Sequence, residues 1–149
     1  MCLCGRRRSR RRCAECGRTS KRYETAVRDA LESDHRLAGF VWDARAAPAT
    51  RRRPDFLWTF DRACVALEVD ENEHADYDAE DETARVREIE RALGRSVAWI
   101  RVRVARGATR ECTEASVVAA SDLIAELISS AQKKVGDSQP KRSVTIEVK

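Results

Sequence analysis

Hydrophobic and polar positions along the chain follow two periods, and together they predict an α/β fold. Apolar residues three or four positions apart predict helices. These helices are expected over residues 20–33, 79–93 and 113–134. Short apolar or alternating runs predict strands over residues 39–44, 54–60, 63–69, 96–104 and 144–148. Because strands and helices alternate, we expect a mixed central sheet of about four strands flanked by helices, with residues 144–148 as a last edge strand.

Length and composition limit the classes of protein. The chain has 149 residues, 42% apolar and 36% charged, which is enough for one ordinary domain. We divide it into a Cys- and Arg-rich head (1–19), a core domain (20–134) and a linker with the edge strand (135–149). The sequence has no apolar run of about 18 residues and no apolar leader, so it predicts neither a membrane span nor secretion. We therefore expect a nuclear or cytoplasmic protein whose cysteines are thiols or metal ligands.

Charge is distributed unevenly along the chain. Residues 1–22 hold nine Arg or Lys and one Glu, a net charge of +8. Residues 68–90 hold eleven acids and two Arg, a net charge of −9. A basic arm suits a polyanion and an acidic centre suits a cation, so the two segments predict one protein that binds both.

The hairpin brings carboxylates together at the end of its second strand. With a two- or four-residue loop centred on residues 61 and 62, Asp55 faces Glu68, whereas a three-residue loop would shift the pairing. Asp70 shares the face of Glu68, because side chains alternate along a strand. Any one of these acids could simply be solvated. Like charges in register destabilise a sheet, however, so the pair favours a shared proton or a cation such as Mg²⁺, which one or two carboxylates can hold.

These same residues carry a resemblance to a known family. Pro54-Asp55 and Glu68-Val69-Asp70 resemble the two acidic motifs of the PD-(D/E)XK nuclease superfamily. The longer pattern RRPDFLW…VALEVDENEH…Y…E…R…WIR is similar to restriction-endonuclease-like proteins of large DNA viruses and algae, and to very-short-patch-repair-type domains. That subgroup typically reads EIDE-x-QH-x-x-Y, and Glu73 here replaces the Gln. The resemblance covers roughly residues 20–104 and implies a restriction-endonuclease-like core.

The resemblance also implies roles for individual residues. Asp55 and Glu68 would bind Mg²⁺ or Mn²⁺, and Asp70 would assist. Glu24 falls where the superfamily often places a further acid, although a solvated helix Glu fits the pattern equally well. His74 would be a metal ligand or a proton shuttle, or else an ordinary surface histidine.

Two departures from the family pattern concern positive charge. Many members have a Lys two residues after the second acid, where this chain has Asp70. Arg85, beside the apolar stripe of its helix, and Arg101, on the following strand, could replace that charge, although most helix Arg residues are solvated. The subgroup's Arg-Phe-Asn-Pro-Asp element after the fourth strand is also missing, and residues 101–104 (RVRV) stand in its place.

The head combines thiols with a run of arginines. Cys2, Cys4, Cys13 and Cys16 could supply four thiolates to a structural Zn²⁺, with a basic tail and incidental thiols as the alternative. Arginines in the head and just before the carboxylates are expected to contact phosphates. These are Arg6, Arg7, Arg8, Arg10, Arg11, Arg12, Arg51, Arg52 and Arg53. The two tryptophans at positions 42 and 58, and Cys64, are expected in the core.

The sequence thus predicts a metal-dependent DNA endonuclease that uses metal-activated water, with DNA as its partner and no membrane or small-molecule substrate. One alternative is a non-catalytic nucleic-acid-binding protein that retains the nuclease fold. The missing Lys favours it, whereas retention of Asp55, Glu68 and Asp70 favours the enzyme. Another alternative is a zinc-dependent interaction module with an acidic docking face.

Overall fold

The computed structural model of the chain describes residues 22–43, 50, 52–71, 79–133 and 143–149. The whole Cys- and Arg-rich head therefore lies outside the described residues, including the four predicted zinc ligands. Arg51, His74 and Tyr77 lie outside them as well. The predictions made for these residues stay predictions.

Helices and strands alternate along the described chain much as the sequence predicts. The helices are α1 (Arg22–Glu32), the 3₁₀ turn η1 (His35–Leu37), α2 (Ala79–Leu93), α3 (Arg110–Ala119) and α4 (Ser121–Gln132). The strands are β1 (Val41–Trp42), β2 (Phe56–Thr59), β3 (Ala63–Glu71), β4 (Ser96–Val104) and β5 (Ser143–Val148). The predicted α/β class is confirmed.

The strands form one mixed sheet in the order β1-β2-β3-β4-β5. β1, β2 and β3 are antiparallel neighbours, whereas β3, β4 and β5 run parallel. The expected core of four strands is extended to five by β5, which pairs along six residues of β4 at the edge of the sheet, where the sequence predicts a last edge strand. Ile146 and Val148 are buried in the main core, so β5 belongs to the sheet rather than to a loose tail.

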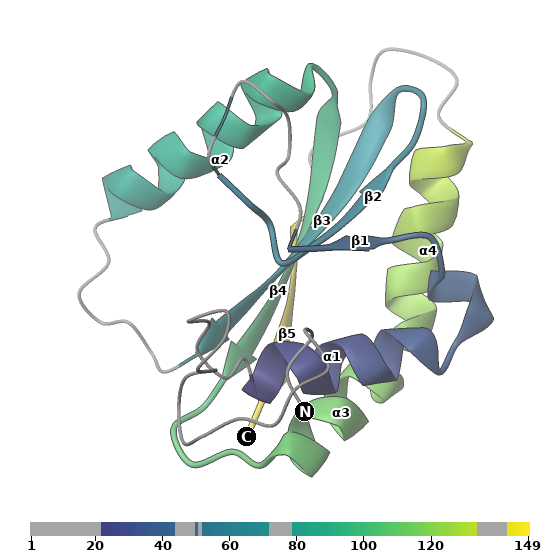
Figure 1. Cartoon of the computed structure of the whole chain (residues 1–149), viewed down its shortest axis with the longest axis vertical. Coiled ribbons are helices and arrows are strands. Elements are labelled where there is room, and N and C mark those ends of the chain that lie inside the picture. Colours follow the sequence, from purple (N-terminus) through teal and green to yellow (C-terminus); the bar gives the residue numbers. More distant parts are fainter. Residues whose placement is uncertain (1–21, 44–49, 51, 72–78, 134–142) are drawn as a thin grey trace, which may run out of the picture.

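Helices cover both faces of the sheet but unequally. In Figure 1, α2 lies on one side of the sheet, and α1, α3 and α4 lie on the other. α1 packs against α3, and α4 packs against β3, β4 and η1.

Among the described helices, none is both long and apolar enough to cross a bilayer.

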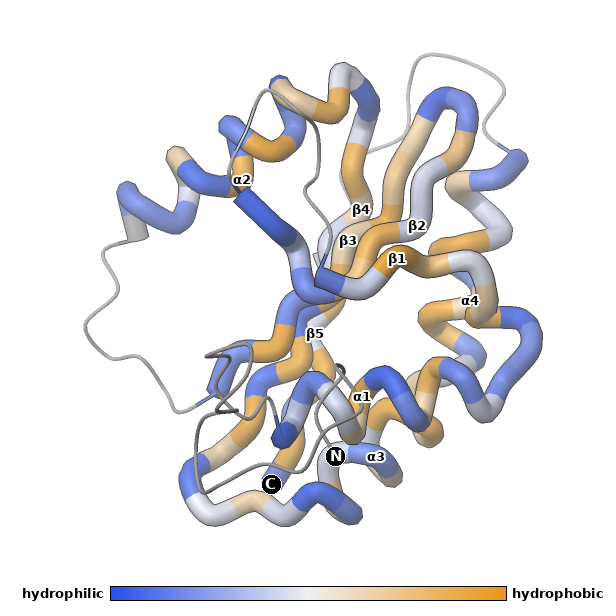
Figure 2. Tube along the Cα trace, viewed as in Figure 1, coloured by the Kyte–Doolittle hydropathy of each residue, from blue (hydrophilic) through white to orange (hydrophobic). Residues whose placement is uncertain are grey.

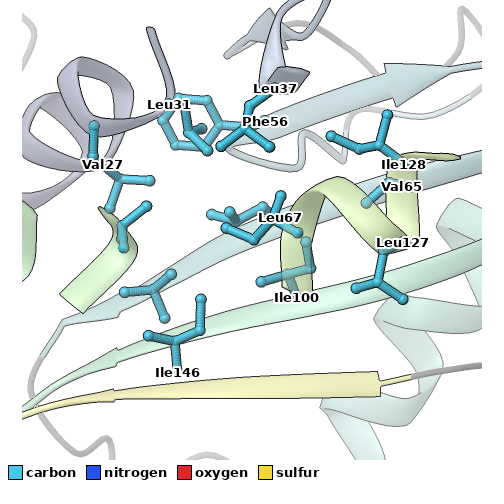
Figure 3. Close-up of a cluster of buried hydrophobic side chains, with 14 of the residues drawn as sticks. Val27, Leu31, Leu37, Phe56, Val65, Leu67, Ile100, Leu127, Ile128 and Ile146 are labelled. Carbon is cyan, nitrogen blue, oxygen red and sulfur yellow. The ribbon is translucent and has the colours of Figure 1, made fainter. Parts of the chain in front are cut away.

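The larger core fills the space between the sheet and the three helices. Figure 3 shows Leu67 and Ile100 from the strands among side chains from α1, η1 and α4. The smaller core lies under α2, where Ile89 packs on residues of the central strands. Figure 2 shows the hydrophobic colour concentrated on the central strands and on the helix sides that face them. Trp58 and Cys64 are buried, as the sequence predicts.

The one clear error in the predicted elements is the long C-terminal helix. Residues 113–134 were expected to form a single helix, but the structure has α3 and α4, which meet at Ala120. Ala120 departs from helical geometry with φ −92° and ψ 2°. Since α3 packs on α1 and β5 while α4 packs on β3 and β4, the chain has to change direction between them. Tertiary packing therefore interrupts a sequence that has neither Gly nor Pro at this point.

Candidate functional site

The hairpin register brings Asp55 and Glu68 face to face. Phe56 pairs with Leu67 and Thr59 pairs with Cys64, which is the register predicted from the loop. Asp55 precedes Phe56 and Glu68 follows Leu67, so the two acids are opposite each other. The Asp55 carboxylate also accepts a hydrogen bond of 2.8 Å from the backbone N–H of Val69. This bond holds the Asp55 carboxylate against β3, one residue beyond Glu68.

Glu68 is an acid in an apolar setting. It is 3% exposed, because β3 runs through the centre of the sheet and α2 covers its face. Side-chain alternation places Glu68 on the same face as Cys64 and Ala66, which belong to the core under α2. Burial raises the pKa of Glu68, and the nearby guanidinium of Arg85 opposes this effect only in part. The pKa of Glu68 is therefore above its ordinary value.

Arg85 reaches Glu68 from α2. Its Nη1 donates to Glu68 Oε2, and Glu82 Oε1 lies 3.8 Å from the same nitrogen. Burial alone would lower the pKa of Arg85, but the bond to Glu68 and the negative charges of Glu68, Glu82 and Asp55 together outweigh it, so the pKa is raised and the side chain stays charged. Arg85 therefore points from α2 toward the sheet, in agreement with its predicted position beside the apolar stripe of the helix.

Arg101 forms a second link between α2 and the sheet. β3 and β4 are parallel with Glu68 directly beside Arg101, so the two side chains lie on one face. Arg101 donates to Glu82, and its Nη1 lies 3.5 Å from Asp70 Oδ2. The sequence does not single out Glu82, although its spacing of three residues from Arg85 puts both on one helix face.

Four acids and two arginines thus meet at this end of β3, and we call them the charged cluster. Its members are Asp55, Glu68, Asp70, Glu82, Arg85 and Arg101. The formal charges leave a net −2, which one divalent cation would neutralise. Among the residues that the structure describes, no three Asp, Glu, His or Cys side chains lie close enough to hold a metal ion together. Mg²⁺ needs only one or two carboxylates beside water and substrate oxygens, so the residues present fit such an ion.

The other predicted site residues that the structure describes, Glu24, Arg52 and Arg53, lie outside this cluster. Glu24 accepts a hydrogen bond of 3.4 Å from the Trp42 indole, on the α1 side of the sheet rather than beside Glu68. Arg53 lies 4.0 Å from Asp43, whose backbone N–H donates to the carbonyl of Asp55. Asp43 has a left-handed backbone with φ 54°, which Asp tolerates better than most residues.

Arg52 pairs with α2, although about half of its side chain stays exposed, at 49%. Its Nε donates to Glu88, and Glu88 also accepts a hydrogen bond of 2.7 Å from the buried Thr50. These bonds lower the pKa of Glu88. The segment that leads into β2 is therefore fastened to the same helix that carries Arg85.

Comparison of the chain with protein-family models, with curated proteins and with solved structures finds no match. The function therefore has to be inferred from the geometry of the chain's own residues.

Proposed function

We propose that this protein is a metal-dependent nuclease that hydrolyses phosphodiester bonds of DNA, with a restriction-endonuclease-like core. The observation that carries the proposal is the placement of Asp55 beside Glu68 at the end of a buried strand. Two carboxylates in register on apolar strands repel each other, and a cation between them removes that repulsion. A solvated strand end would not bury one of them almost completely.

In this proposal Asp55 and Glu68 hold Mg²⁺ or Mn²⁺, with Asp70 beside them. When bound, the cation polarises the phosphodiester and lowers the pKa of the attacking water. Arg85 and Arg101 take the part of the Lys that many members of the family have and this chain lacks, since each can pair with phosphate oxygens and offset the charge that develops there. Their place on α2 and β4 next to Glu68 supports this role.

Residues outside the described part of the chain complete the proposal. His74 follows β3 closely in sequence and would ligate the metal or carry a proton. Cys2, Cys4, Cys13 and Cys16 would hold a structural Zn²⁺, which would shape the head. The arginines of the head would contact the DNA backbone, which contributes affinity but not sequence specificity.

A plasmid-nicking assay with Mg²⁺ or Mn²⁺ tests the proposal. We expect cleavage by the full chain and a loss of at least about a hundredfold in Asp55→Asn and Glu68→Gln, because each removes a metal ligand. Glu32→Gln is the matched control, since its exposed side chain lies on α1 away from the cluster. Equal cleavage by the wild type and all three variants would show that the activity comes from a contaminant.

The existing ion pairs favour one other candidate, a nucleic-acid-binding protein that keeps this fold without catalysis. Arg85 pairs with Glu68 and Arg101 pairs with Glu82, so part of the acidic charge is already balanced within the chain. This candidate predicts duplex DNA binding at low salt without a calorimetric Mg²⁺ or Mn²⁺ site. The zinc-dependent interaction module instead predicts no DNA binding at low salt.

A further inference from the structure

The charged cluster is an alternating series of acids and arginines. Asp70 contacts Arg101, Arg101 contacts Glu82, Glu82 lies near Arg85, and Arg85 contacts Glu68. Glu82 therefore lies between the two arginines, within reach of both. Each arginine has one partner on β3 and a second on α2, so either can leave its β3 partner without losing every contact.

Glu68 uses only part of its capacity to accept. Arg85 occupies Oε2, whereas Oε1 is buried and has no hydrogen-bond partner among the described residues. Buried carboxylate oxygens are normally satisfied, so an orphaned one is open to a ligand that the described residues do not supply. Oε1 of Glu68 and the carboxylate of Asp55 are hard oxygen donors of the kind that Mg²⁺ and Mn²⁺ prefer.

Arg85 also opposes that ligand. A divalent cation at Glu68 would lie close to the guanidinium that bonds the other oxygen of the same carboxylate, and like charges at such a distance repel strongly in a poorly hydrated site. The Arg85 side chain is 25% exposed, so part of it is open to a ligand from solvent. A phosphate diester offers two oxygens that match the planar fork of Arg better than one carboxylate oxygen does.

We propose that Arg85 keeps the divalent cation away from Glu68 until a nucleic-acid phosphate replaces Glu68 as the partner of this arginine. Metal and nucleic acid therefore bind cooperatively. This inference rests on the proposed function, because it concerns the same site. Glu82 holds Arg101 in place during the exchange, and it offers Arg85 a second carboxylate near the site. Binding linkage requires the coupling to be reciprocal: DNA raises the affinity for metal by the factor by which metal raises the affinity for DNA.

Mn²⁺ titration followed by electron paramagnetic resonance tests the inference without any turnover. The full chain is titrated alone and with a short phosphorothioate duplex that resists hydrolysis, and binding to the duplex alone is subtracted. We expect the duplex to tighten Mn²⁺ binding by about tenfold, within the usual range of coupling between sites. An unchanged Mn²⁺ affinity in the presence of bound duplex would overturn the inference.

Variants separate the charge of Arg85 from its packing. Arg85→Gln should bind Mn²⁺ about tenfold more tightly than the wild type without DNA and should lose most of the effect of the duplex. Arg85→Lys keeps the charge and should behave like the wild type. Arg87→Gln removes the same charge from an exposed position two residues away on α2, and it should change neither value. Equal Mn²⁺ affinities for Arg85→Gln and Arg87→Gln would overturn the inference.

The same experiments distinguish failure of the inference from failure of the proposed function. Plasmid cleavage that depends on Glu68, together with Mn²⁺ binding that is indifferent to the duplex, would remove the coupling and leave the nuclease. Absence of a Mn²⁺ site in the wild type and in Arg85→Gln, with and without duplex, would remove both. Circular dichroism of each variant establishes that it is folded before titration.

Discussion

The two faces of the sheet use the same strands in opposite ways. On the side of α1, α3 and α4, residues such as Leu67 and Ile100 belong to a large apolar core, and among the described residues no charged side chain is buried on that side. On the side of α2, a smaller apolar core gives way to the charged cluster toward the end of β3. Successive residues of β3 serve the two faces in turn, since Leu67 faces the large core and Glu68 faces α2.

This difference shows where stability and binding reside. The three-helix face buries most of the apolar surface and contributes most to the free energy of folding. The α2 face includes a nearly buried carboxylate, which lowers stability unless it is paired. A buried acid that has a shifted pKa and contacts charged partners is a candidate functional residue, because it lowers the stability of the fold unless it is paired. Four predictions test this contrast.

The largest expected effect follows from removing a ring on the three-helix face. Phe56 is fully buried and packs edge-on against Phe40 at 5.4 Å between ring centroids. Phe56→Ala should lower the free energy of unfolding by about 3–5 kcal/mol, the usual range for Phe→Ala in a core. Urea denaturation measures it, with Val41→Ala on exposed β1 as the control. A loss below about 1 kcal/mol would mean that this face is not the main core.

On the α2 face, Arg85→Ala should destabilise the protein by about 3 kcal/mol at neutral pH, because it leaves Glu68 as an unpaired buried charge. The pKa of Glu68 is already raised and would rise further in the variant. A raised carboxyl pKa means that stability falls as pH increases through the titration of that group. The destabilisation should therefore be larger at pH 8 than at pH 5, as urea denaturation can measure. A pH-independent loss would point to packing instead of charge.

A pair of matched substitutions compares the faces directly. Ile89 on α2 and Ile100 on β4 are both fully buried, in the smaller and the larger core respectively. Ile→Val usually costs about 0.5–1.5 kcal/mol. We expect Ile100→Val near the top of that range and Ile89→Val near the bottom. The single helix α2 can shift toward the sheet and reduce the cavity that the lost methyl group leaves, whereas the helices on the other face also pack against one another and can shift less. Thermal denaturation of both variants gives the order, and the reverse order would contradict the contrast.

The smallest effect concerns an exposed ion pair away from both cores. Hydrogen bonds from Arg36 lower the pKa of Asp34 to about 2. A lowered carboxyl pKa contributes stability that is present above about pH 4 and is lost as pH falls through about 2. Asp34→Asn should therefore reduce the thermal midpoint slightly at pH 5, and the difference should vanish toward pH 2. A constant difference would show that the backbone cap of η1, and not the charge, matters.

Much of the fold could be predicted from local patterns. The end of α2 at Gly94, which has a left-handed φ of 62°, and the bounds of β4 follow from periodicity and a glycine. The pairing of Asp55 with Glu68 follows from the short loop, because a tight hairpin determines its own register. The break at Ala120 could not be predicted, since no local residue causes it.

Some features of the charged cluster follow from the sequence, and others follow only from the tertiary structure. The sequence alone determined that acids gather where β3 emerges, that Glu68 and Asp70 share a face, and that Arg85 adjoins the apolar stripe of its helix. Only the tertiary structure decided that Arg85 pairs with Glu68 and that Glu82 joins Arg85 to Arg101. Local spacing sets the face of an element on which a side chain lies. Its partners depend on how α2 packs across the parallel pair β3–β4, which is a contact between distant parts of the chain.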